Sequence, residues 1–129
     1  FCKVFGEYEG VYAEGFALCA GLQWCMEAGL SDILVEGDSL VLVRLVQNRS
    51  VGKWPLCSVL SQLRLLLGKV KGSITHIYRE ANAVADSLAA LSRESPYVTF
   101  QSCQQLPSRV RSLINLDAIG YPYIRRFTV

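Results

Sequence analysis

The sequence predicts a mixed α/β fold in which helices flank a parallel strand pair, and two observations favour it. Residues 32–36 read Asp-Ile-Leu-Val-Glu, and their uninterrupted apolar centre is typical of a parallel strand that is covered on both faces. From this strand onward, strand and helix patterns alternate, which favours a parallel sheet with right-handed crossovers. The chain has 129 residues, about half of them apolar, which is enough for one such domain.

The first part of the chain predicts a strand followed by a helix. Residues 2–8 are rich in β-formers and predict a short strand. Apolar side chains recur at helical spacing over residues 11–28, so we expect a largely buried helix there, with Gly29 as its C-terminal cap. Gly15 and Gly21 lie inside this helix, where each costs about 1 kcal/mol relative to alanine. We therefore expect both glycines to mark close packing against another element.

The strand at residues 32–36 is followed by two helices, a second strand and a last helix. Their expected ranges are 40–47, 54–67, 73–78 and 83–91. Pro55 suits the first turn of the second helix, Gly68 suits its end, and Asn82 is expected to cap the last helix. We expect residues 1–94 to form the domain and residues 95–129, which contain further prolines, to form a C-terminal tail packed on it.

Three carboxylates, those of Glu14, Asp38 and Asp86, each lie where one predicted element passes into the next. In an open α/β sheet such junctions converge on one edge, and carboxylates held close together are costly unless divalent cations neutralise them. Glu14 lies in an otherwise apolar helix, where a glutamate without a partner is expensive. Two interpretations stay open for Asp38 and Asp86, because each can be a metal ligand or can stabilise the start of the helix that follows it.

Composition excludes several classes of function. The net charge of +2 permits a polyanionic partner without arguing for one. Five cysteines without CxxC spacing and a single histidine do not favour a zinc site, and such thiols predict a reducing intracellular compartment, the nucleus or the cytoplasm. The sequence has no GxSxG, GxGxxG or P-loop motif. It also has no apolar run of the ~18 residues that a membrane span needs.

The order of three motifs is more specific than any one of them. Ala-Glu lies at a helix start, Glu-Gly-Asp-Ser follows a strand, and Arg-Glu-Ala-Asn-Ala-Val-Ala-Asp-Ser-Leu-Ala leads into the last helix. In this order they resemble the ribonuclease H-like fold, and most of all the plant ribonuclease-H-like domain related to retrotransposon reverse transcriptases. The match covers residues 3–92. It implies that the first two strands of the family are missing, because no aspartate precedes Asp32 to supply the Asp-Gly of the opening strand.

The resemblance also implies an activity. The family uses four carboxylates to hold two Mg²⁺ ions, with Mn²⁺ as a substitute, and the motifs place Glu14, Asp38 and Asp86 at three catalytic and metal-binding positions. The implied substrate contacts are Ser39, Arg79 and Asn82. The implied reaction is two-metal hydrolysis of the RNA strand of an RNA–DNA hybrid, impaired here by the absent first acid. A non-catalytic ribonuclease-H-like module that binds nucleic acid or protein is the alternative.

Missing strands would leave an apolar sheet edge open at residues 33–35, which natural proteins rarely do. We expect residues 3–8 either to fill the vacant position beside residues 32–36 or to leave it free for a partner chain. In the second case the protein would self-associate through that edge.

Overall fold

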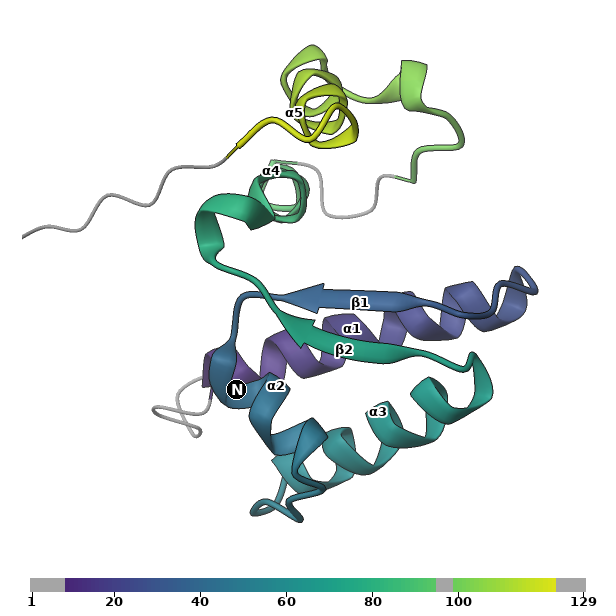
Figure 1. Ribbon diagram of the computed structural model, residues 1–129, viewed down its shortest axis with the longest axis vertical. Helices are drawn as coiled ribbons and strands as arrows, with labels where there is room; N and C mark the ends of the chain where they lie inside the picture. The colour runs from purple at the N-terminus through teal and green to yellow at the C-terminus, as the bar shows by residue number, and fades with distance from the viewer. Residues whose placement is uncertain (1–8, 95–98, 123–129) are drawn as a thin grey trace, which may run out of the picture. The chain divides into compact units, whose positions relative to one another are not determined.

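The computed structural model of the protein describes residues 9–94 and 99–122 (Figure 1). The strand expected at residues 2–8 lies outside the described residues. The chain divides into two compact units, of which the first ends at Ile77 and the second begins at Tyr78. The boundary expected after residue 94 falls inside the second unit. Among the described residues, no helix is long and apolar enough to cross a membrane.

The first unit has a parallel strand pair with helices packed against it. Its elements are α1 (Glu9–Glu27), β1 (Leu34–Gly37), α2 (Leu40–Gln47), α3 (Leu56–Lys69) and β2 (Ser73–His76). The two strands pair in parallel, with Leu34 opposite Ser73 and Val35 opposite Ile74. The helices between them supply the crossover that a parallel pair requires. This arrangement confirms the mixed α/β fold with a parallel strand pair.

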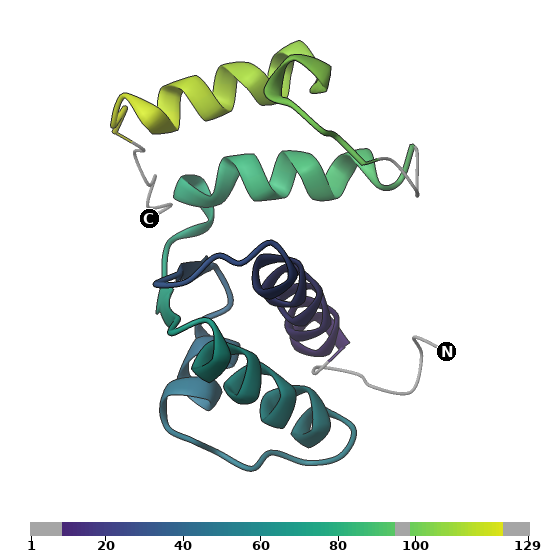
Figure 2. The ribbon, with the colours of Figure 1, turned by 90° about the vertical axis from the view of Figure 1, so that its right-hand side faces the viewer.

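The core of the first unit lies between α1, α3 and one face of the strand pair, and both helices lie on that face (Figures 1 and 2). The buried side chains recur at three- and four-residue spacing along α3, as on the inner face of an amphipathic helix. The buried side chains of the whole core, from all elements of this unit, are Cys19, Leu22, Leu42, Val43, Val46, Leu56, Val59, Leu60, Leu63, Leu66, Leu67, Val70 and Ile74.

The two glycines inside α1 differ in their surroundings. A Cβ atom on Gly15 would lie 2.8 Å from Cγ1 of Val59, so Gly15 permits the close approach of α1 and α3 and the prediction for it is confirmed. Around Gly21 no described atom, apart from its chain neighbours and the nearby backbone of α1, lies within 4 Å of the position that a Cβ would take. The prediction of a close neighbour is therefore wrong for Gly21 within the described part of the chain.

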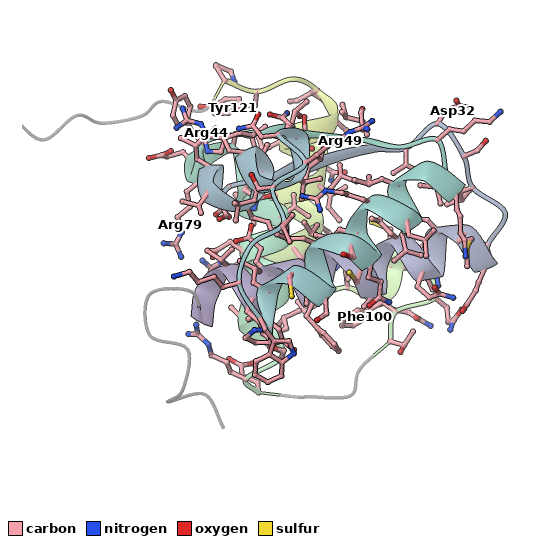
Figure 3. All side chains as sticks on the ribbon, turned by 90° about the horizontal axis from the view of Figure 1, so that it is seen from below. Asp32, Arg44, Arg49, Arg79, Phe100 and Tyr121 are labelled. Carbon is pink, nitrogen blue, oxygen red and sulfur yellow. The ribbon has the colours of Figure 1, made fainter. Side chains whose placement is uncertain are left out.

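Three helices of the first unit end in the same way, with a residue in the left-handed conformation. Gly29 has φ +73, its N–H donates to the Met26 carbonyl, and the next N–H donates to the Cys25 carbonyl, which is the Schellman motif and confirms the predicted cap. Arg49 (labelled in Figure 3) and Lys71 hold the equivalent positions after α2 and α3, with φ of 52 and 50. Because the motif at Lys71 ends α3, the helix continues through Gly68, and the end predicted there is wrong.

The second unit contains a short 3₁₀ turn, η3 (Arg79–Asn82), then α4 (Ala83–Leu91), the 3₁₀ turn η4 (Cys103–Gln105) and α5 (Ser108–Ala118). The helices α4 and α5 lie side by side (Figure 2). Helix α4 has the predicted range. The predicted cap is wrong, because Asn82 makes no side-chain capping hydrogen bond and the chain enters α4 through η3 instead. Among the described residues of this unit, only the Val110 side chain belongs to the buried apolar set.

Candidate functional site

Glu14 and Asp38 lie next to each other in the first unit. Glu14 is in the N-terminal half of α1, and Asp38 directly follows β1. Between them lies Gly37, which is buried, and a Cβ at this glycine would lie 3.6 Å from Oε1 of Glu14. The carboxyl of Glu14 shares a hydrogen bond with the carboxyl of Asp38 and accepts another from the backbone of Ser39. The junction between β1 and α2 therefore brings these two predicted site residues together.

The surroundings of Glu14 raise the pKa of its carboxyl above the ordinary value of 4.5. The largest cause is burial, and the charge of Asp38 and the hydrogen bond with its carboxyl raise the pKa further. The hydrogen bond from the Ser39 backbone lowers it and offsets part of the shift. Two carboxylates this close disfavour the doubly charged state unless a cation lies beside them.

Ser39 rather than Asp38 caps helix α2. Its Oγ accepts the Leu42 N–H at 3.3 Å, and its backbone is extended, as an N-cap requires. The interpretation of Asp38 as the cap is therefore wrong. With the cap supplied by its neighbour, the carboxylate of Asp38 is left to contact Glu14. The side chain of Glu36, one residue before Gly37, is exposed to solvent and lies outside this contact.

The other predicted site residues belong to the second unit. Asp86 is in the first turn of α4, where a negative charge interacts favourably with the helix dipole. Its Oδ1 lies 3.7 Å from Nη2 of Arg79, whose side chain extends into solvent (Figure 3). Both side chains are mostly exposed, so this ion pair contributes at most about 1 kcal/mol. The first unit thus holds Glu14, Asp38 and Ser39, and the second holds Arg79, Asn82 and Asp86.

Within the described part of each unit, no three His, Cys, Asp or Glu side chains form a group that could hold a metal ion. The first unit provides two carboxylates. Carboxylate oxygens are the ligands that Mg²⁺ prefers, and Mg²⁺ is commonly held by one or two protein carboxylates together with water and substrate phosphate. The chemistry of the Glu14 and Asp38 pair therefore fits a hard divalent cation.

Sequence reasoning missed two residues that shape this region. Gly37 is buried beside the carboxyl of Glu14, where a Cβ would make an ordinary contact of 3.6 Å with Oε1, and the signal for it was the glycine directly before Asp38. Arg64 donates from Nη2 to the carbonyl of Leu45 at 2.8 Å and to the carbonyl of Ser50. These hydrogen bonds connect α3 to the last turn of α2 and to the loop that follows it, and α2 is the helix that Ser39 caps. A charged residue beside the apolar positions of α3 was the available signal.

Comparison with known proteins agrees with this fold. A model of the reverse transcriptase-like family matches residues 2–92. A protein of Arabidopsis thaliana with the curated name "Putative ribonuclease H protein" is 29% identical over 130 residues, which cover 98% of this chain and 20% of that protein. The chain thus spans about a fifth of the length of this relative. No solved structure matches. Because the family model covers more than half of the chain, the protein belongs to the reverse transcriptase-like family and is a ribonuclease-H-like domain of the plant type.

Proposed function

We propose that this domain binds nucleic acid and hydrolyses the RNA strand of an RNA–DNA hybrid with the help of Mg²⁺ or Mn²⁺. The observation that carries the proposal is the contact between Glu14 and Asp38 at the end of a parallel strand. Ligand sites of open α/β sheets lie at the carboxyl ends of strands. The name of the Arabidopsis relative, a ribonuclease H protein, supports the same activity.

A purely structural role explains this pair poorly. Glu14 and Asp38 raise the energy of the folded state when both are charged. Among the described residues, no lysine or arginine forms a salt bridge with either of them. A divalent cation would remove the repulsion that Asp38 exerts on Glu14. We therefore assign the two carboxylates to metal binding, with Asp86 as a third ligand assigned from its motif alone.

In the proposed hydrolysis, each of the site residues has a separate role. Glu14, Asp38 and Asp86 supply carboxylate oxygens, and two bound ions would activate a water molecule and stabilise the leaving oxygen. The hydroxyl of Ser39 accepts the Leu42 N–H, and its own proton stays available for a substrate oxygen. Arg79 and Asn82 supply donors of the kind that contact nucleic-acid backbones. Four cysteines of the described residues are free thiols, which suits the nucleus or the cytoplasm as the compartment.

The test combines metal binding with cleavage. We expect MgCl₂ to raise the melting temperature of the wild-type chain and to have little effect on Glu14→Gln and Asp38→Asn. Because this chain supplies three of the four carboxylates that the family uses, we expect the wild-type chain to cleave a labelled RNA–DNA hybrid only slowly with Mg²⁺ or Mn²⁺, and we expect Asp38→Asn to leave the hybrid intact. Glu36→Gln is the matched control, because it removes an exposed carboxylate of the same strand, and it should behave like the wild type.

Two outcomes would contradict the proposal. Hybrid binding without cleavage, together with no response to Mg²⁺, would support the non-catalytic module instead. Cleavage that survives in both Glu14→Gln and Asp38→Asn would show that the hydrolysis does not depend on this pair.

A further inference from the structure

The loop between α2 and α3, residues 48–55, presents two apolar side chains to solvent. Trp54 is 80% exposed and Val51 is 77% exposed, the two highest values among the large apolar side chains that the structure describes. The loop lies at the end of α2 away from Ser39, about 12 Å along the helix axis, because α2 has eight residues (Figure 1). This surface is therefore separate from the carboxylate pair.

Contacts with the core hold the backbone of this loop in place. Gly52 has φ +69, and a Cβ on it would lie 2.9 Å from Cδ1 of Leu60, a fully buried core residue. Nη2 of Arg64 donates to a carbonyl of the loop, and the Lys53 carbonyl accepts the N–H of Cys57 at 3.0 Å. Because these contacts fix the backbone, the apolar side chains of the loop stay on its solvent side.

Charge is segregated along the first unit, and the loop lies in its basic part. From Ser39 to Ile77 the sequence contains no aspartate or glutamate. Within the loop, the side chains of Arg49 and Lys53 are exposed, and neither forms a salt bridge with a described residue. The other cations of this segment are Arg44, Arg64, Lys69 and Lys71. Cations without anionic partners favour a polyanionic ligand at this loop.

We propose that this loop binds single-stranded nucleic acid, with the Trp54 indole stacked on an unpaired base and with Arg49 and Lys53 beside the adjoining phosphates. Aromatic side chains stack on bases of any sequence, and neighbouring cations hold the backbone. In a duplex the faces of the bases cover each other, so only an unpaired base offers its face to the indole. Lys53 directly precedes Trp54, so the phosphate and the base of one nucleotide can engage neighbouring residues.

The size of the exposed apolar surface favours a nucleic acid over a protein partner. A stable protein interface buries about 800 Å² on each side, whereas one aromatic side chain buries about 150–250 Å². Trp54 and Val51 together fall far short of a protein interface, but one ring is enough to stack on one base.

This binding goes beyond the proposed hydrolysis, because it needs neither the carboxylate pair nor a metal ion. The loop contains no carboxylate side chain, and stacking and phosphate neutralisation do not require a divalent cation. The binding can therefore be measured in EDTA, where the two-metal reaction does not run. A failure of this inference leaves the cleavage test unaffected, and a chain that does not cleave can still bind a single strand.

Fluorescence anisotropy of the full chain with labelled oligothymidylate in EDTA tests the proposal. We expect the wild type to bind this single strand more tightly than an RNA–DNA hybrid of equal length. Trp54→Ala should weaken single-strand binding by about tenfold and should leave hybrid binding unchanged. Lys53→Gln should lower the slope of log K against log[NaCl] by about 0.7, the value for one contact to a single-stranded phosphate.

Two matched controls remove the same chemistry elsewhere on the first unit. Trp24→Ala deletes the other tryptophan, which is 64% exposed on α1, and Lys69→Gln removes an exposed lysine at the end of α3. Both variants should bind like the wild type. In a second measurement, Trp24→Phe leaves Trp54 as the only tryptophan, and the single strand should quench its fluorescence.

Single-strand binding that survives Trp54→Ala, or that Trp24→Ala weakens equally, would overturn the proposal. So would an equal loss of hybrid binding in Trp54→Ala, since a stacked base requires an unpaired strand. A wild-type chain that does not bind the single strand would overturn it too. Trp54 fluorescence that changes with protein concentration in the absence of nucleic acid would overturn it as well, and would identify a second copy of the chain at this loop.

Discussion

Glu14 and Asp38 form a half-buried pair of carboxyl groups, and the physical consequence is a local conflict between charge and burial. Burial and the neighbouring charge both favour a protonated Glu14. Such arrangements usually occur where a protein sacrifices stability for function. The conflict can be measured in the free protein, because it makes stability depend on pH.

We expect Glu14→Gln to stabilise the free protein at pH 7 and not at pH 4. The folded state raises the pKa of Glu14 above 4.5, so it binds this proton more tightly than the unfolded state does, and stability falls as pH rises from 4.5 through the raised value. Because the group is partly exposed, solvent screens the effect and limits the gain to about 1 kcal/mol or less. Urea unfolding at both pH values measures it, and an equal gain at pH 4 and pH 7 would contradict the electrostatic explanation.

The helix ends show how two elements are terminated without glycine. Arg49 and Lys71 occupy the left-handed positions after α2 and α3, where a Cβ atom crowds the backbone. Glycine holds the equivalent position after α1 and avoids this crowding. The first unit thus carries two strained caps that a substitution can relieve.

We expect Lys71→Gly to raise the free energy of unfolding by about 1 kcal/mol, because glycine adopts a positive φ without strain. The matched control is Lys69→Gly, which makes the same change two residues earlier in the last turn of α3. It should lower stability by about 0.5–1 kcal/mol, because glycine is a poor helix former. Urea unfolding of both variants checks the prediction, and a loss of stability in Lys71→Gly would contradict it.

The two units of the molecule differ in how much apolar surface each of them buries. The first unit has a connected core drawn from α1, α2, α3 and β2. In the described part of the second unit, Val110 is the one buried apolar side chain, and α4 has none. Local stability follows buried apolar contacts, so the units are expected to differ in stability as well.

We expect amides of α4 and α5 to exchange through openings of lower free energy than those of α3, since α3 supplies much of the core. Native-state hydrogen exchange with mass spectrometry on the full chain measures both units in one experiment. Equal protection of α3, α4 and α5 would contradict the prediction and would show that the two units open together.

Much of the fold could be predicted because the signals are local. The ranges of α2 and α4 agree with the predicted ranges, since hydrophobic periodicity and breakers within a few residues determine a helix. The cap at Gly29 is confirmed for the same reason. The end of α3 was predicted two residues early, because no sequence signal marks Lys71 as a residue with positive φ.

The sequence by itself determined that strands and helices alternate, that Asp38 follows a strand and that Asp86 lies in the first turn of a helix. Glu14, which was expected at a junction, lies inside α1 instead, because this helix begins at Glu9. Only the tertiary structure decided that Glu14 contacts Asp38, that Ser39 caps α2, and that Gly21 borders an open cleft. The contact of Glu14 with Asp38 and the cleft beside Gly21 depend on atoms that are distant in sequence, whereas the Ser39 cap is a local bond that the sequence left undecided because Asp38 and Ser39 both suit an N-cap. The burial and the neighbouring charge that raise the pKa of Glu14 exist only after α1 has packed beside the end of β1.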